Sequence, residues 1–293
     1  MQKKTLLITG WNGMLAYDFI KTQSEDYTII ALDKTACDIT SYSHIEQVLK
    51  QYTPDIVLNC AAYTAVDDAE DIGMKLCYDI NTLWSYNLAR ATASSWIDFI
   101  TLSTDYVFDG RKEHWYLPED ACNPLGVYGM SKYLSEQLVK RENPMSVIIR
   151  TSWLYGGERY GEDSGVYKNF VNTMLRLSET RDELRVVSDQ YGIPTSCVDL
   201  SHAISQVIQS IQSFRGDIIH FSNSSLSGGI HWADFAREIY TLNGKNTSIQ
   251  ECSTQEYPLK AVRPQWSILL NPSTIQLPDW KDALKRYLTS SHQ

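Results

Sequence analysis

Short apolar segments alternate with longer amphipathic ones through the first half of the chain, and this alternation constrains the fold more than any other feature. Five apolar segments predict buried strands, at residues 4–9, 27–32, 55–60, 98–103 and 146–150. Four amphipathic segments between them predict helices, at residues 13–22, 43–51, 78–94 and 128–140. Buried strands that alternate with helices form βαβ units, whose right-handed crossovers place helices on both faces of a parallel sheet. The sequence therefore predicts an α/β fold with a doubly wound parallel sheet.

The second half of the chain has a looser pattern. It predicts helices at residues 169–177, 198–211 and 231–241, one more strand at residues 217–221, and an irregular segment with four prolines at residues 258–278. We expect residues 1–150 to form the main domain, with residues 186–222 returning to it. Residues 151–185 and 223–293 would then form a smaller lobe at the C-terminal edge of the sheet.

Composition excludes several classes of protein. The 293 residues include 26 basic and 35 acidic ones, which gives a formal net charge of −9 and argues against binding to nucleic acid or to anionic membranes. Hydrophobic residues make up 43% of the chain, too many for a disordered protein. No apolar stretch approaches the roughly 20 residues that span a bilayer, and the apolar run after the N-terminal lysines breaks at Thr9 and Gly10.

Cysteine and histidine positions give no sign of a metal site. The six cysteines are scattered without a CxxC pair, and the six histidines show no HExxH spacing. We therefore predict no metal, and we expect mostly buried, reduced thiols in a cytoplasmic protein.

A glycine turn joins the first predicted strand to the first predicted helix. Gly10 and Gly13 would let the backbone turn tightly and let a pyrophosphate reach the helix N-terminus, where N–H groups favour anions. Ala16 takes the place of the usual third glycine. Asp33, at the end of the second strand, could accept hydrogen bonds from an adenosine ribose, whereas the adjacent Lys34 could tolerate a 2′-phosphate. The turn thus predicts a Rossmann-type dinucleotide site for NADH or NADPH; an ordinary glycine-rich turn and a surface charge are the alternatives.

Tyr128 and Lys132 are four residues apart, so both side chains lie on one face of the predicted helix. A nearby ammonium would lower the pKa of Tyr128 from about 10, and the tyrosine could then protonate a carbonyl oxygen as hydride reaches the carbon. Lys132 could also hold the nicotinamide ribose. Thr104, with Ser103 as the competitor, follows a strand and could hydrogen-bond the reacting oxygen. The three residues together predict carbonyl reduction.

Further motifs accompany these residues in a fixed order over nearly the whole chain. They lie at residues 10–15, 38–40, 59–67, 81, 103–110, 128–132, 150–156, 169–171, 189–195 and 263–264. The ordered set resembles the extended short-chain dehydrogenase/reductase superfamily, and within it the dTDP-4-dehydrorhamnose reductase family. This resemblance is far more specific than any single motif.

The resemblance implies a function and a set of site residues. The family reduces the C4 keto group of dTDP-4-dehydrorhamnose to give dTDP-L-rhamnose, with NADPH or NADH as cofactor, which implies a small-molecule partner and a monomer or homodimer. The catalytic positions correspond to Thr104, Tyr128 and Lys132. The cofactor positions correspond to Gly10, Asn12, Gly13, Met14, Leu15, Asp38, Ile39, Ala61, Ala62 and Tyr63, together with Tyr128 and Lys132. The substrate positions correspond to Thr64, Val66, Thr104 and Trp153, with Asn169, Gln190 and Arg263 as further contacts.

The chain departs from the family pattern at several places. Trp84 and Ser135 stand where the family usually has small residues, and the segment 157–168 is longer than in typical members. Some members hold magnesium at a dimer contact, but Val198 occupies one of the expected acidic positions. Apart from Trp153, the tryptophans are expected to be packing or surface residues. A reductase or epimerase for another nucleotide sugar, and a non-catalytic regulatory subunit on the same scaffold, are the alternatives.

Overall fold

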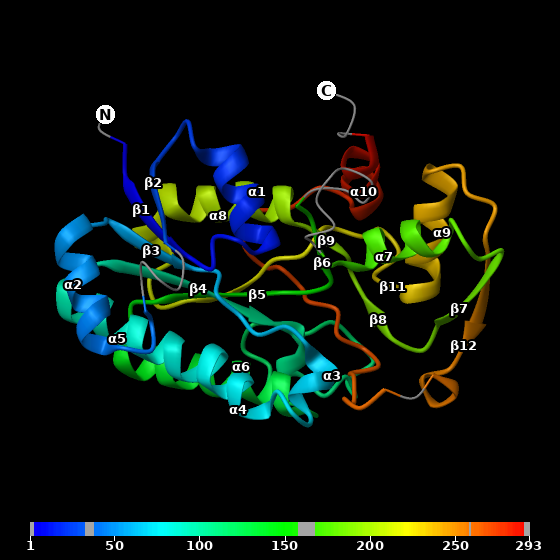
Figure 1. The fold of residues 1–293 in the computed structure, drawn as a ribbon, viewed down its shortest axis with the longest axis horizontal. Coiled ribbons are helices and arrows are strands. Elements are labelled where there is room, and N and C mark those ends of the chain that lie inside the picture. Colours follow the sequence, from blue (N-terminus) through cyan, green and yellow to red (C-terminus); the bar gives the residue numbers. More distant parts are fainter. Residues whose placement is uncertain (1–2, 33–37, 158–167, 258, 290–293) are drawn as a thin grey trace.

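The main sheet of the protein has six strands, all parallel to their neighbours. The computed structural model describes residues 3–32, 38–157, 168–257 and 259–289 (Figure 1). The strands are β1 (Thr5–Thr9), β2 (Thr28–Leu32), β3 (Ile56–Asn59), β4 (Asp98–Thr104), β5 (Val147–Thr151) and β10 (Ile218–His220). Their order is β10-β5-β4-β3-β1-β2, and every neighbouring pair is parallel. The predicted doubly wound parallel sheet is confirmed.

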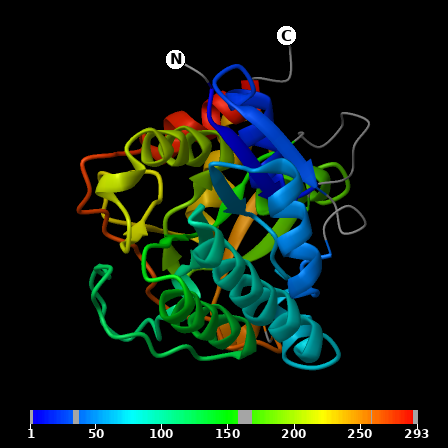
Figure 2. The same ribbon diagram turned by 90° about the vertical axis from the view of Figure 1, so that its left-hand side faces the viewer.

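Helices cover both faces of this sheet (Figures 1 and 2). One face carries α1 (Met14–Gln23) and α8 (Cys197–Gln209), and the other carries α2 (Tyr42–Tyr52), α5 (Ser85–Ser95) and α6 (Val127–Glu142). The helix predicted at residues 78–94 is longer than expected: α4 (Met74–Tyr78), the π-helical segment η1 (Asp79–Trp84) and α5 follow one another without a break. The π-helical turn was not predicted.

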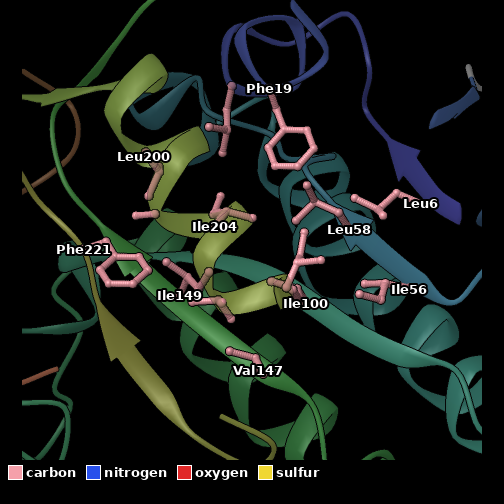
Figure 3. Packing of buried hydrophobic residues seen from close by; sticks show 14 of the residues in the cluster. Leu6, Phe19, Ile56, Leu58, Ile100, Val147, Ile149, Leu200, Ile204 and Phe221 are labelled. Atoms are coloured by element: carbon pink, nitrogen blue, oxygen red, sulfur yellow. The ribbon is translucent and has the colours of Figure 1, made fainter. Parts of the chain in front are cut away.

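The core has two apolar layers because the side chains of each buried strand alternate between the faces of the sheet. Leu6 and Ile8 pack toward α1 and α8, whereas Leu7 faces α2 and α5. Figure 3 shows the first layer, where Phe19 of α1 and Ile204 of α8 lie over the strands. The two layers anchor the carboxyl ends of the strands, where the candidate site lies.

A separate apolar cluster lies beyond the sheet, on the side of Figure 1 that holds α9. It is built from α7 (Phe170–Leu177), α9 (Trp232–Leu242) and α10 (Trp280–Thr289), with β7 (Glu183–Val187) parallel to β12 (Ser248–Cys252). The helices α7 and α9 were predicted, but β7, β12 and α10 were not. β7 exposes alternate residues, and β12 exposes Ser248, Gln250 and Glu251, so neither strand forms a continuous apolar run.

Short elements complete the chain. They are α3 (Val66–Ala69), the 3₁₀ turns η2 (Asp105–Val107), η3 (Ile211–Ser213) and η4 (Thr254–Glu256), and the two-residue strands β6 (Leu154–Tyr155), β8 (Tyr191–Gly192), β9 (Thr195–Ser196) and β11 (Ile230–His231). The helix α3 carries Asp67 and Asp68 in its first turn. The five described cysteines are free thiols. Within the described ranges, no helix is long and apolar enough to cross a membrane.

Replacing Ile204 with alanine is expected to lower the free energy of unfolding by about 2–5 kcal/mol, because the side chain is fully buried between α8 and the sheet. Urea unfolding followed by circular dichroism would measure this loss. The control Ile72→Ala removes a side chain that is 87% exposed and should change stability by no more than about 0.5 kcal/mol. Equal stability of the two variants would contradict the packing in Figure 3.

Candidate active site

The turn after β1 requires glycine at its first position. Gly10 has a φ of +67°, and a Cβ atom there would lie 2.6 Å from the backbone nitrogen of Ala61, at the end of β3. The turn continues into α1, whose N-cap residue Gly13 makes no side-chain capping bond. The strand, the glycine turn and the helix N-terminus together form a cradle that suits an anionic group.

This cradle opens into a cavity of about 240 Å³. The cavity lies at the carboxyl ends of β1 and β3, where the strand order reverses and where doubly wound sheets bind ligands. Its lining residues are Thr9, Gly10, Trp11, Asn12, Gly13, Leu32, Asp38, Ile39, Cys60, Ala61, Ala62, Ile80 and Trp84. Most of the predicted cofactor positions therefore meet here, but Trp11, Ile80 and Trp84 were not among those predicted.

The remaining predicted cofactor positions lie close to the cavity or outside the described residues. Leu15 and Met14 are the first two residues of α1. Leu15 is buried in the apolar layer between α1 and the sheet, and Met14 packs against that layer. The backbone N–H of Tyr63 donates to Oδ1 of Asn81 at 2.8 Å, which fixes the chain after β3 against η1. Asp33 lies outside the described residues.

Thr104, Tyr128 and Lys132 come together at the end of β4. Thr104 Oγ1 accepts from the N–H of Tyr106 at 3.2 Å, and its hydroxyl lies near the side chain of Tyr128. Tyr128 lies in the first turn of α6, with its ring edge-to-face with Tyr106 at 5.7 Å between centroids. The Nζ atom of Lys132 donates to the carbonyl oxygen of Leu102 at 2.7 Å.

Burial is the main influence on the pKa values of Tyr128 and Lys132. It raises the pKa of Tyr128 above its usual value, and the neighbouring Thr104 hydroxyl opposes the shift only in part. Burial also lowers the pKa of Lys132 to about 8, against the opposing effect of Glu136. The expected lowering of the Tyr128 pKa was wrong in direction, because desolvation by burial is the largest effect on this side chain. Tyr128 is therefore fully protonated at neutral pH.

The carboxyl group of Asp105 hydrogen-bonds the side chains of Thr104 and Ser267. Its Oδ1 accepts from Thr104 Oγ1 at 3.0 Å, and its Oδ2 accepts from Ser267 Oγ at 2.6 Å. The carboxyl is buried, which raises its pKa to about 6. Ser267 belongs to the C-terminal segment, so this bond ties that segment to the end of β4.

A buried ion pair lies one turn behind Lys132 on α6. Glu136 accepts from Nε and Nη2 of Arg150 on β5 at 2.9 and 2.7 Å, and from Ser103 Oγ at 2.5 Å. Arg150 is fully buried, and its other N–H groups contact the Pro118 carbonyl oxygen, His220 and Cys122. The five donors of its guanidinium are thus all engaged. The pair joins α6 to the sheet one helical turn from Lys132.

The predicted substrate positions divide into two groups. Val66 lines a small cleft with Tyr106 and Tyr128, and Thr64 lies exposed two residues earlier. Gln190 and Arg263 line a second cavity, of about 200 Å³, against the lobe that contains α9. The other residues that line it are Phe170, Met174, Arg185, Val186, Val187, Trp232, Tyr257 and Leu259.

Three of these positions have structural partners that the sequence did not reveal. Trp153 has a φ of +47° and stacks on Trp232, with ring centroids 3.5 Å apart. Asn169 caps α7 and donates to the carbonyl oxygen of Gly156 at 3.1 Å. Arg263 pairs with Asp67 at 2.6 Å, which holds the pKa of that carboxyl below its usual value. In the described part of the chain, no cluster of three His, Cys, Asp or Glu residues could hold a metal ion.

Comparison with known proteins gives matches over the full length. A sequence model of the RmlD substrate binding domain matches residues 4–293. The chain is 37% identical to dTDP-4-dehydrorhamnose reductase of Sinorhizobium fredii, with 96% of this chain and 95% of that protein covered. It is 36% identical to the spore coat polysaccharide biosynthesis protein SpsK of Bacillus subtilis, with 97% and 96% covered.

The structure of dTDP-4-dehydrorhamnose reductase from Bacillus anthracis in complex with NADP superposes with a TM-score of 0.90 at 35% identity, and covers 99% of this chain and 100% of that one. The chain belongs to the dTDP-4-dehydrorhamnose reductase family. It is therefore an enzyme of the oxidoreductase class, and the resemblance inferred from the ordered motifs is confirmed. The Rossmann-type fold of this reductase family is the six-stranded sheet described above.

Arg150→Met is expected to lower the free energy of unfolding of this reductase family member by about 3–5 kcal/mol, because Glu136 would stay buried without its cation. The double variant Arg150→Met/Glu136→Gln removes both charges and keeps an acceptor for Ser103, so it should recover a large part of the loss. Urea titrations of the two variants would compare them. A double variant no more stable than Arg150→Met would contradict the pairing.

Proposed function

We propose that the chain reduces the C4 keto group of dTDP-4-dehydrorhamnose to give dTDP-L-rhamnose, with NADPH or NADH as the hydride donor. The main support for this proposal is that Thr104, Tyr128 and Lys132 lie close together at the sheet edge that also bears the Gly10 cradle. The reductase names of relatives at 30–37% identity and the NADP complex of the Bacillus anthracis enzyme support it.

The residues present fit a dinucleotide. The Gly10 position leaves no room for a Cβ, and the N-terminus of α1 faces the cradle, which suits a pyrophosphate held by residues 10–15. Asp38 and Ile39 would hold the adenosine end, and residues 61–63 would line the middle. Lys132 would hold the ribose beside the nicotinamide. When bound, the cofactor supplies the hydride that goes to C4 of the sugar.

The side chains at the end of β4 would supply the proton. Tyr128 keeps its proton at neutral pH and can pass it to the oxygen on C4 as that oxygen gains charge. Thr104 would hydrogen-bond the same oxygen and orient it toward Tyr128. The ammonium of Lys132 would stabilise the phenolate that Tyr128 leaves behind.

The second cavity suits the nucleotide part of the substrate. Its aromatic side chains Phe170 and Trp232 could pack against a pyrimidine base. Arg185 and Arg263 pair with Glu256 and Asp67, and would exchange these carboxylates for the diphosphate of the substrate. We propose accordingly that residues 1–150 and 186–222 bind the dinucleotide, and that residues 151–185 and 223–293 form the substrate-binding lobe. A cytoplasmic location, where nucleotide sugars would be available, belongs to the same proposal.

Tyr128→Phe is expected to lower kcat by about 10²–10⁴-fold, because it removes the proton donor and leaves the ring. NADPH affinity, measured by isothermal titration calorimetry, should stay within about threefold, because the cradle is untouched. Tyr133→Phe, on the same helix but outside the site, is the matched control. Near wild-type reduction of dTDP-4-dehydrorhamnose by Tyr128→Phe would exclude the assigned role, and product NMR with other nucleotide ketosugars would test the substrate.

Cofactor affinity is expected to fall as the pH rises through about 8. The pKa of Lys132 is lowered to about 8, so its ammonium is present below that pH and is lost above it. The affinity for NADPH should drop by up to about tenfold per pH unit between pH 8 and 9.5. Calorimetric titrations would measure this, with Lys132→Met losing the dependence and the exposed Lys281→Met keeping it. A wild-type affinity that is flat over this range would contradict the role of Lys132.

A further inference from the structure

The cavity beside the glycine turn has an aromatic wall at the end that bears Asp38 and Ile39. Trp84 lines the cavity together with these two residues and Leu32. Its indole is partly buried and packs against the apolar layer that contains Leu32, Ile39 and Leu88. The sequence predicted a packing or surface role for this tryptophan, and the structure places it in the lining of the cavity.

The helix geometry explains how Trp84 reaches this place. Trp84 is the last residue of the π-helical segment η1, and the extra residue in such a turn changes the direction of the side chains that follow. Asn87, three residues later and on the same side of the helix, donates to the carbonyl oxygens of Ile39 and Thr40 at 3.2 and 3.3 Å. The helix therefore fixes the segment 38–40 and the indole relative to each other.

The other tryptophan of the cavity occupies a different position. Trp11 lies within the glycine turn, between Gly10 and Asn12, and its side chain is 42% exposed. The turn is the part of the cavity suited to phosphate groups. Apart from the Asp38 side chain, the end formed by Leu32, Ile39 and Trp84 is apolar, and it suits a flat, uncharged ring.

We propose that the indole of Trp84 stacks on the adenine base of the cofactor and makes the adenosine half a major source of its affinity. The proposal rests on the cofactor site described under the proposed function. An aromatic face binds a purine through stacking, which needs no hydrogen-bond pattern and contributes to affinity wherever the two planes can overlap. Ile39 and Leu32 would contact the base on the sides that the indole does not cover.

The test separates the two halves of the cofactor. ADP-ribose carries the adenosine half, and reduced nicotinamide mononucleotide carries the other. Trp84→Ala should weaken ADP-ribose and NADPH by roughly 5- to 150-fold, the range that a lost stacking contact gives. The mononucleotide should be affected by less than about twofold. Calorimetric titration or displacement of NADPH would measure all three, and Trp84→Phe, which keeps an aromatic face, should recover much of the loss.

Leu83→Ala is the matched control, because Leu83 is the preceding residue of η1 and is half exposed. It should leave all three affinities unchanged. An ADP-ribose affinity of Trp84→Ala within twofold of the wild type would overturn the proposal, as would an equal loss for the mononucleotide.

A second measurement uses the wild-type protein and does not depend on the folding of a variant. The fluorescence of 1,N⁶-etheno-ADP is quenched when its base stacks on an indole, so binding should quench it, and Leu83→Ala should quench it equally. Binding without quenching would overturn the stacking. A wild-type protein that binds neither NADPH nor ADP-ribose would instead contradict the proposed cofactor site, so the two failures are distinguishable.

Discussion

The buried pair between Arg150 and Glu136 holds α6, the helix that bears Tyr128 and Lys132, to the sheet, and the candidate site depends on it. Arg150 rises from β5 and Glu136 from α6, so their two short hydrogen bonds fix the helix one turn below Lys132. Desolvation makes such a pair costly unless every polar group is satisfied, and here Ser103, Pro118 and neighbouring side chains complete the set. The negative charge of Glu136 also helps to keep the nearby ammonium protonated, against the effect of burial.

The main sheet could be predicted because parallel strands are buried on both faces and so appear as continuous apolar runs, such as residues 55–60. The second cluster could not be predicted in the same way. β12 reads Ser-Ile-Gln-Glu-Cys, and its place beside β7 is set by partners that lie 65 residues earlier in the chain. By contrast α10 carries a helical apolar pattern at Trp280, Leu284 and Tyr287, which a closer reading of the periodicity would have found.

For the site, the sequence predicted that Tyr128 and Lys132 lie on one face of a helix, but not what surrounds them. The i, i+4 spacing placed Tyr128 beside Lys132, yet the spacing carries no information on desolvation, and the direction of the tyrosine pKa was therefore wrong. Arg263 was expected to be open to a diphosphate, whereas Asp67, 196 residues away, already pairs with it. Trp84 reached the cavity through a π-helical turn, for which a single sequence offers no recognisable pattern.

The bond between Ser267 and Asp105 has a consequence for synthesis of the protein. The five strands β1–β5 leave the ribosome early, and most of the dinucleotide cradle lies within the first hundred residues. The carboxyl that supports Thr104 finds its partner only after residue 267 has emerged, 162 positions later. A nascent chain can thus form five of the six strands of its sheet and the lining of its cofactor cavity before the Thr104 end of the candidate site is assembled.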